Sequence, residues 1–117
     1  MNIKERFLKY VSFDTQSDAN SSTHPSSKKQ FDLGNYLVKE LHELGVENAF
    51  IDEYCYVYGY IPSNCGSNKT IGLIAHMDTA GEASGKDIKP QTIEFYTGNK
   101  IIVNSEYIWI FTKNGKQ

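Results

Sequence analysis

Apolar residues recur at helical spacing at the start of the chain. Ile3, Phe7 and Val11 stand four residues apart, which places them on one face of a helix. This spacing predicts a first helix near Ile3–Phe13. The next stretch, Asp14–Ser27, has no apolar period and is rich in serine, threonine, aspartate and asparagine, so we expect a surface loop there.

A second helical pattern follows this loop and is longer. Ser27 and Gln30 have the spacing of a capping box, and Gly45 supplies a typical C-terminal stop. Together these signals predict a helix over about Lys28–Leu44. Its apolar face consists of Phe31, Gly34, Leu37, Val38, Leu41 and Leu44.

Several shorter segments are β-branched and aromatic, which favours strands. Thr70–Ala75 is a compact, mostly apolar run, as expected for a strand buried on both faces of an α/β sheet. The turn-like residues Thr97–Asn99 and Asn104–Glu106 separate the last strands. The predicted strands are Val46–Ile51, Tyr56–Ile61, Thr70–Ala75, Gln91–Tyr96, Ile101–Asn104 and Tyr107–Thr112.

Length and composition limit the classes of protein that fit. A chain of 117 residues suits one domain, and its net charge of -2 provides no field that would attract nucleic acid or an anionic membrane. No apolar run approaches the length of a membrane span, and Met1–Tyr10 lacks the features of a signal peptide, so the expected location is the cytoplasm. Cys55 and Cys65 have no metal-binding spacing and are expected to be reduced thiols.

His76 and Asp78 carry the chemistry that the residues themselves suggest. They follow the predicted strand Thr70–Ala75, and ligands bind at the carboxyl ends of strands in open α/β sheets. Residues two apart on extended backbone face the same way, so Asp78 can reach the His76 ring. A carboxylate on the far nitrogen of an imidazole is a common support for a metal ligand. On spacing alone, however, a structural or surface histidine is the commoner case.

Three other patterns in the sequence have plainer explanations. The remaining histidines do not indicate ligands, because His24 lies in the polar loop and His42 is expected on the exposed side of the second helix. Gly81–Asp87 lacks the glycine spacing of a phosphate-binding loop. Alternating aromatic residues resemble a nucleic-acid stacking face, but core or interface packing is favoured because no basic groove accompanies them. They are Tyr54, Tyr56, Tyr58 and Tyr60.

A longer resemblance goes beyond these patterns. The segments around His76 resemble the metal-site region of peptidase T, a family of tripeptide aminopeptidases among the co-catalytic zinc exopeptidases. Upstream segments resemble the same family in the same order, so the likeness runs from about Ile3 to Asn104. The segments that carry it are Glu5–Val11, Phe13–Asp18, Thr23–Ser27, Gln30–Leu33, Asp52–Glu53, Tyr56–Tyr58, Ile71–Ala80, Ala83–Lys86 and Lys89–Gln91.

The resemblance implies a fold and an activity. It implies the amino-terminal part of a three-layer α/β/α catalytic domain over residues 1–117, with both helices packed on the sheet and no lid or dimerisation domain. His76 would ligate one of two zinc ions, and Asp78 would be the catalytic acidic residue beside it. The complete enzyme would release the N-terminal residue of a small peptide substrate, a tripeptide, with zinc activating a bridging water.

The resemblance also implies that most of this site lies elsewhere. The family's general base and its other zinc ligands lie downstream of the matched region, so we expect a truncated chain that is inactive alone. The alternative is a non-catalytic remnant that binds metal weakly or associates with itself. In that case the candidate contact is the apolar strand Tyr107–Thr112. The resemblance to the family implies an acidic and polar continuation at this place instead.

Overall fold

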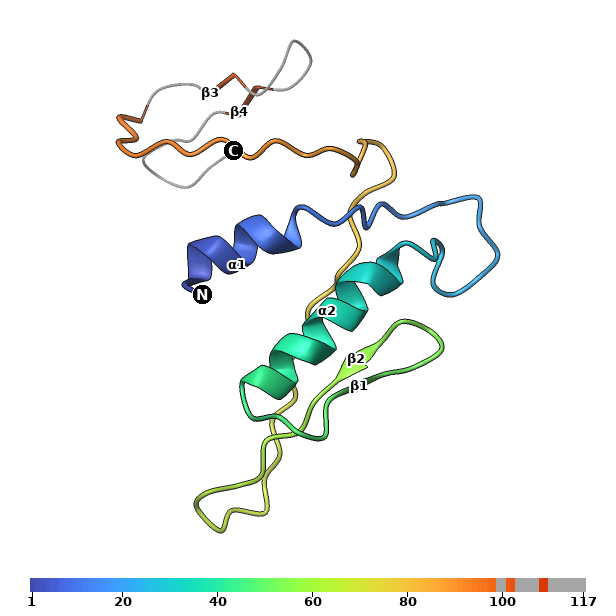
Figure 1. The fold of residues 1–117 in the computed structure, drawn as a ribbon, viewed down its shortest axis with the longest axis vertical. Coiled ribbons are helices and arrows are strands. Elements are labelled where there is room, and N and C mark those ends of the chain that lie inside the picture. The colour runs from blue at the N-terminus through green and yellow to red at the C-terminus, as the bar shows by residue number, and fades with distance from the viewer. Residues whose placement is uncertain (99–100, 103–107, 110–117) are drawn as a thin grey trace.

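The computed structural model describes residues 1–98, 101–102 and 108–109. This part of the chain combines two helices with short antiparallel strands, a mixed composition that agrees with the α/β class at its coarsest level (Figure 1). In chain order the elements are α1 (Ile3–Tyr10), α2 (Gln30–Glu43), β1 (Phe50–Ile51), β2 (Val57–Tyr58), β3 (Ile101–Ile102) and β4 (Ile108–Trp109).

Helix α1 begins with a reciprocal cap that the sequence analysis missed. The Asn2 side chain accepts a hydrogen bond from the Glu5 amide, and the Glu5 carboxylate accepts one from the Asn2 amide. These bonds satisfy amides that no earlier turn of the helix can reach. The helix ends at Tyr10, three residues before the predicted end, and its predicted apolar stripe is partly solvent-facing because Ile3 and Phe7 are exposed.

Helix α2 starts two residues later than predicted and without the predicted capping box. Its N-cap is Lys29, which makes no side-chain cap bond. The Gln30 side chain points instead to the carbonyl of Thr15 in the preceding loop. At the other end the prediction is confirmed, since Gly45 has a φ of 89° and the amides of Gly45 and Val46 close the helix.

The predicted strands Val46–Ile51 and Tyr56–Ile61 are real but short. β1 and β2 pair antiparallel, with Phe50 opposite Tyr58, and helix α2 lies against the hairpin. The two layers approach closely at Gly34, where an added Cβ would overlap Ile51 Cδ1 and lie 3.4 Å from the Sγ of Cys55. The described hydrophobic core is small, and its buried members are Leu33, Ala49 and Cys55.

A polar cluster joins α1 to α2. Glu40 is only 6% exposed, and its carboxylate accepts a short hydrogen bond from the Tyr10 hydroxyl. The Arg6 Nε lies 3.3 Å from the other carboxylate oxygen without forming a hydrogen bond. Burial, together with the bond to Glu40, raises the pKa of Tyr10 to about 12.

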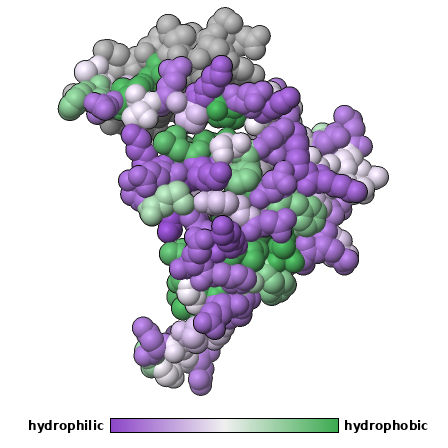
Figure 2. Space-filling model, viewed as in Figure 1, coloured by the Kyte–Doolittle hydropathy of each residue, from purple (hydrophilic) through white to green (hydrophobic). Residues whose placement is uncertain are grey.

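The predicted buried strand Thr70–Ala75 is not present. The segment forms no strand and pairs with no other segment of the described chain, and Leu73 and Ile74 are 95% and 100% exposed. The composition alone cannot bury a segment, because a strand needs neighbours on both edges and both faces. Apolar surface also reaches solvent in several separate places between polar regions (Figure 2).

The end of the described chain agrees with the strand predictions only in part. β3 and β4 lie within the predicted Ile101–Asn104 and Tyr107–Thr112 and pair antiparallel, with Ile101 opposite Trp109. Gln91–Tyr96 forms no strand. Gly98 has the positive φ of a turn, and the turn Asn104–Glu106 lies outside the described residues.

The described elements do not form three layers. Their radius of gyration is 17.8 Å, above the roughly 13 Å expected for a compact domain of this length. The hairpin sheet and the β3–β4 sheet are separate two-stranded sheets. Within the described ranges, no helix is long and apolar enough to cross a bilayer.

Candidate functional site

Two segments that are far apart in the sequence lie side by side. Asp14–Ser17 and Thr79–Gly81 meet in one parallel bridge. The Ser17 amide donates a hydrogen bond to the Thr79 carbonyl at 2.9 Å, and the Thr79 amide donates to the Thr15 carbonyl at 3.1 Å. The backbone immediately after Asp78 is therefore held by the loop between the two helices.

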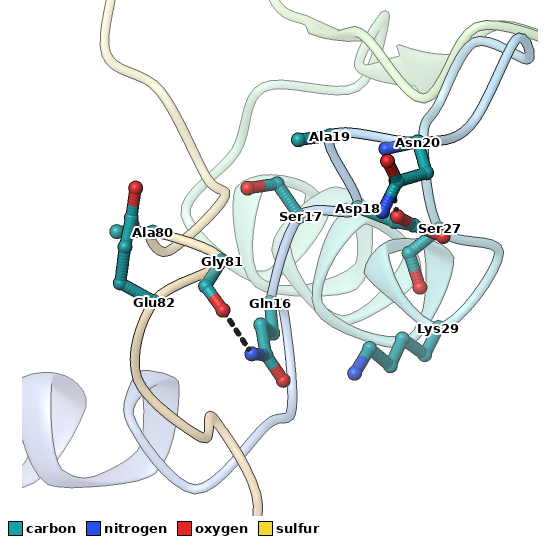
Figure 3. A pocket seen from close by; sticks show the side chains of 10 residues that line it. All are labelled: Gln16, Ser17, Asp18, Ala19, Asn20, Ser27, Lys29, Ala80, Gly81 and Glu82. Atoms are coloured by element: carbon teal, nitrogen blue, oxygen red, sulfur yellow. Dashed lines mark hydrogen bonds between the residues drawn. The ribbon is translucent and has the colours of Figure 1, made fainter.

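Side chains strengthen the same contact. The Ser17 hydroxyl donates to the Thr79 carbonyl at 3.0 Å, so this oxygen accepts two hydrogen bonds from one residue. The amide nitrogen of Gln16 donates to the Gly81 carbonyl at 2.8 Å, the dashed contact in Figure 3. Each bond joins residues more than sixty positions apart in sequence.

The loop that makes these contacts is itself fixed to the start of α2. The ammonium of Lys29 lies 2.8 and 2.9 Å from the two carboxylate oxygens of Asp14, and this bond holds the pKa of Asp14 below its usual value. Thr15 is only 3% exposed, and the Gln30 amide reaches its carbonyl at 3.4 Å. Gly85 packs so closely that an added Cβ would lie 2.8 Å from Asp14 Oδ1.

The place where Asp14–Ser17 meets Thr79–Gly81 is called the junction. A hollow of about 830 Å³, lined mostly by polar residues, lies beside it. Its walls come from Gln16–Asn20, from Ser27 and Lys29 near the start of α2, and from Ala80–Glu82 (Figure 3). The ionisable side chains among them carry both signs, since Asp18 and Glu82 are acidic and Lys29 is basic. Polar residues predominate in this lining, and its apolar members are Ala19, Ala80 and the backbone of Gly81.

His76 and Asp78 are brought together as the sequence predicts. The His76 Nδ1 lies 3.1 Å from the Asp78 Oδ1 and 2.9 Å from the Asp78 carbonyl oxygen. Both oxygens are acceptors, so Nδ1 carries the proton in this geometry. Nε2 makes no hydrogen bond within the described chain, and the His76 side chain is 85% exposed. The free nitrogen therefore faces solvent with its lone pair available.

The described residues do not hold a complete metal site. They contain no group of three or more histidine, cysteine, aspartate or glutamate side chains close enough to bind one ion. His42 is exposed on α2, as predicted, and its Nε2 donates to the Ala49 carbonyl at 2.9 Å. His24 lies exposed in the loop before α2. Neither histidine joins His76.

The alternating tyrosines of the hairpin region do not enter a core in the described chain. Tyr54, Tyr56, Tyr58 and Tyr60 are each about half exposed, so they are not buried in a core of the described chain, and packing at an interface stays a prediction. The hairpin is too small to cover them. The ring of Tyr58 stacks on that of Phe50 with 5.0 Å between centroids. The two cysteines are free thiols, as predicted.

Comparison with known proteins places these segments in context. No family model matches the chain. It is 55% identical to "Peptidase T" of Alkaliphilus oremlandii over 108 residues, which are 90% of this chain and 26% of that protein. "Peptidase T" of Clostridium acetobutylicum is 50% identical over 103 residues, and that of Bacillus subtilis 48% over 105. The chain is homologous to part of peptidase T. It spans about a quarter of the length of these curated relatives.

The homology confirms the resemblance to peptidase T. The junction itself could not be read from the sequence, because nothing local links Gln16 or Ser17 to the residues after Asp78. The resemblance to peptidase T covers nearly the whole chain, so it does not single out this pair of segments.

Proposed function

We propose that this chain supplies one zinc ligand, His76, and its supporting acid, Asp78, to a peptidase T-type active site. The reaction is the release of the N-terminal residue of a tripeptide. The observation that carries the proposal is the pair of oxygens around His76 Nδ1, because they direct Nε2 outward as a ligand nitrogen. Identity of 47–55% to peptidase T relatives supports the same assignment.

The fit to zinc is partial. A neutral imidazole supported by a carboxylate suits zinc, but a catalytic zinc usually takes three protein ligands and a pair of ions needs more. The described residues gather no such group. When bound, zinc would lower the pKa of water and polarise the peptide carbonyl. No hydrolytic step is assigned to this chain, because groups from outside it must complete the site.

The same proposal extends to the fold, the partners and the location. We place residues 1–117 in the catalytic domain of a three-layer α/β/α peptidase, with α2 and its hairpin as one piece of that architecture. The exposed Ile71, Leu73 and Ile74 support this placement, because a central strand would present such residues to neighbours absent here. The small peptide substrate belongs to the complete enzyme. The location proposed is the cytoplasm, without nucleic-acid or membrane partners.

Zinc binding and tripeptide hydrolysis by the purified chain test the proposal. Isothermal titration with zinc is expected to show weak binding that His76→Ala abolishes and Asp78→Asn weakens by about 10- to 100-fold. Hydrolysis of a tripeptide should be absent in all three proteins. Equal zinc affinity of the chain and His76→Ala would contradict the ligand role, and turnover that both variants lose would contradict the need for outside ligands.

A second function is favoured by the exposed apolar segment. Ile71, Leu73 and Ile74 are exposed and lie in a segment that has no strand partner in the described chain. Unpaired apolar strands recruit other chains, so we also propose self-association, with Tyr107–Thr112 as the further contact. Sedimentation velocity over a range of concentrations decides this, since a monomer at the highest concentration removes the proposal. A Leu73→Lys variant should shift the equilibrium toward monomer.

A further inference from the structure

The peptide group between Asp78 and Thr79 is held from both sides. Its N–H donates to the Thr15 carbonyl at 3.1 Å, and its C=O accepts from the His76 Nδ1 at 2.9 Å. The two ends of one peptide plane point in opposite directions. A fixed N–H on one side therefore fixes where the carbonyl points on the other side.

The side of this peptide that faces Thr15 is well anchored. Thr15 is nearly fully buried, whereas the His76 side chain is 85% exposed and has no packing of its own to orient it. Ser17 binds the next carbonyl twice, and Gln16 binds the carbonyl of Gly81. The loop around the buried Thr15 thus supplies order for His76 in addition to the contact that the ring makes with the Asp78 carboxylate.

We propose that Thr15–Ser17 is a positioning segment that orients the His76 imidazole through the Asp78–Thr79 peptide. Hydrogen bonds in a chain polarise one another, so the bond from Thr79 to Thr15 also strengthens the acceptor that His76 uses. The segment holds the proton on Nδ1 and leaves Nε2 free. Gln16 and Ser17 bind the carbonyls of Gly81 and Thr79, which hold the chain just after this peptide, and they touch neither nitrogen of the ring.

The inference deepens the proposed role of His76. It rests on the proposed function only in that a fixed ring would serve zinc binding there. Ring geometry and tautomer are properties of the metal-free chain. They can be measured whether or not the protein hydrolyses peptides, so failure of the proposed function leaves this test standing.

Nitrogen-15 NMR of the His76 ring is the test, at alkaline pH where imidazoles are neutral. The purified chain should show mainly the Nδ1–H tautomer. The double variant Gln16→Ala, Ser17→Ala should move the tautomer ratio roughly two- to tenfold toward that of a synthetic peptide of residues 70–84, which keeps Asp78 but lacks the positioning segment.

Glycine variants supply a second perturbation with a matched control. Gly85→Ala places a Cβ 2.8 Å from Asp14 Oδ1 and 3.3 Å from the Gln16 backbone nitrogen, so it should push the two segments apart and shift the ratio in the same direction. Gly72 is nearer than Gly85 to His76 in sequence, but an added Cβ there meets nothing within 4 Å, so Gly72→Ala should leave the ratio unchanged.

The outcomes separate clearly. Three results together support the positioning role. The tautomer ratio shifts in the double variant and in Gly85→Ala, the Thr79 amide exchanges faster in both, and the ratio in Gly72→Ala is unaltered. The role is overturned if the 70–84 peptide already shows the ratio of the whole chain, because Asp78 alone would then suffice. An unaltered ratio in both perturbing variants overturns it as well.

Discussion

Replacing Tyr10 by phenylalanine should loosen α1 from α2 while leaving both helices formed. The hydroxyl of Tyr10 donates to a Glu40 carboxylate that is only 6% exposed. The other carboxylate oxygen makes no hydrogen bond, and its ion pair with Arg6 is the remaining support. The variant therefore leaves a buried charge without its hydrogen-bond donor.

The magnitude follows from the type of bond lost. A hydrogen bond to a charged group contributes about 1.5–3 kcal/mol, and partial exposure of Tyr10 places this bond near the lower end. A loss of about 1.5 kcal/mol corresponds to roughly tenfold faster exchange of the α1 amides if they exchange by local opening. The phenyl ring retains the aromatic contact with Tyr36, whose ring centroid is 6.2 Å away.

Native-state hydrogen exchange measured by NMR checks this expectation. Amides of α1 should exchange about tenfold faster in Tyr10→Phe, whereas those in the middle of α2 should hardly change. Lys39→Ala is the matched control, because its 3.9 Å pair with Glu43 is exposed and worth about 0.3–0.5 kcal/mol. Equal α1 exchange rates in Tyr10→Phe and the parent chain would refute the view that this cluster joins the helices.

The same cluster gives a pH dependence with a definite sign. The pKa of Tyr10 is raised to about 12 from an ordinary 10.0, so the neutral form is favoured by folding. Its contribution is complete below pH 10 and is lost as pH rises from 10 to 12. A shift of two units is about 2.7 kcal/mol, which solvent screening reduces to about 1–2. Exchange in α1 of Tyr10→Phe should lack this alkaline loss.

Three further results are expected. Gly34→Ala should lower the free energy of unfolding by about 1 kcal/mol in urea titration, because overlap with the hairpin outweighs the gain in helix propensity, and Gly34→Val should cost more. Lys29→Ala should raise the pKa of Asp14, which carbon-13 NMR can follow. The Lys29–Asp14 pair stabilises the fold above the ordinary carboxyl pKa, and this stabilisation is lost as pH falls through the lowered pKa. The variant should lack it. Iodoacetamide should modify Cys65 well before Cys55, because hydrogen bonds lower the pKa of the exposed Cys65 thiol and burial raises that of Cys55; equal rates by mass spectrometry would contradict this.

Features that depend on neighbouring residues were predicted well. The end of α2 at Gly45 was correct because a positive φ is a local requirement that glycine meets. The approach of Asp78 to His76 was correct because residues two apart on extended backbone share a side. The predicted capping box at Ser27 does not form, because the Gln30 side chain donates to the Thr15 carbonyl, which lies outside the motif.

Features that depend on distant contacts could not be predicted. Thr70–Ala75 has the composition of a buried strand, yet burial requires surrounding structure that the described chain does not provide. The bond from Gln16 to the Gly81 carbonyl spans 65 positions, and no periodicity encodes such a pairing. The contact between His76 and Asp78 was therefore foreseen, but the loop that holds the backbone after Asp78 was not.

A chimeric enzyme tests the central claim most directly. The matched segment of this chain replaces its counterpart, about a quarter of the protein, in the Alkaliphilus oremlandii peptidase T. Tripeptide hydrolysis by the chimera should be zinc-dependent, should be abolished by His76→Ala, and should fall by about 10- to 100-fold with Asp78→Asn. His42→Ala, which alters an exposed histidine on α2, is the control and should keep full activity. A folded chimera that hydrolyses tripeptides equally well with His76→Ala would contradict the account.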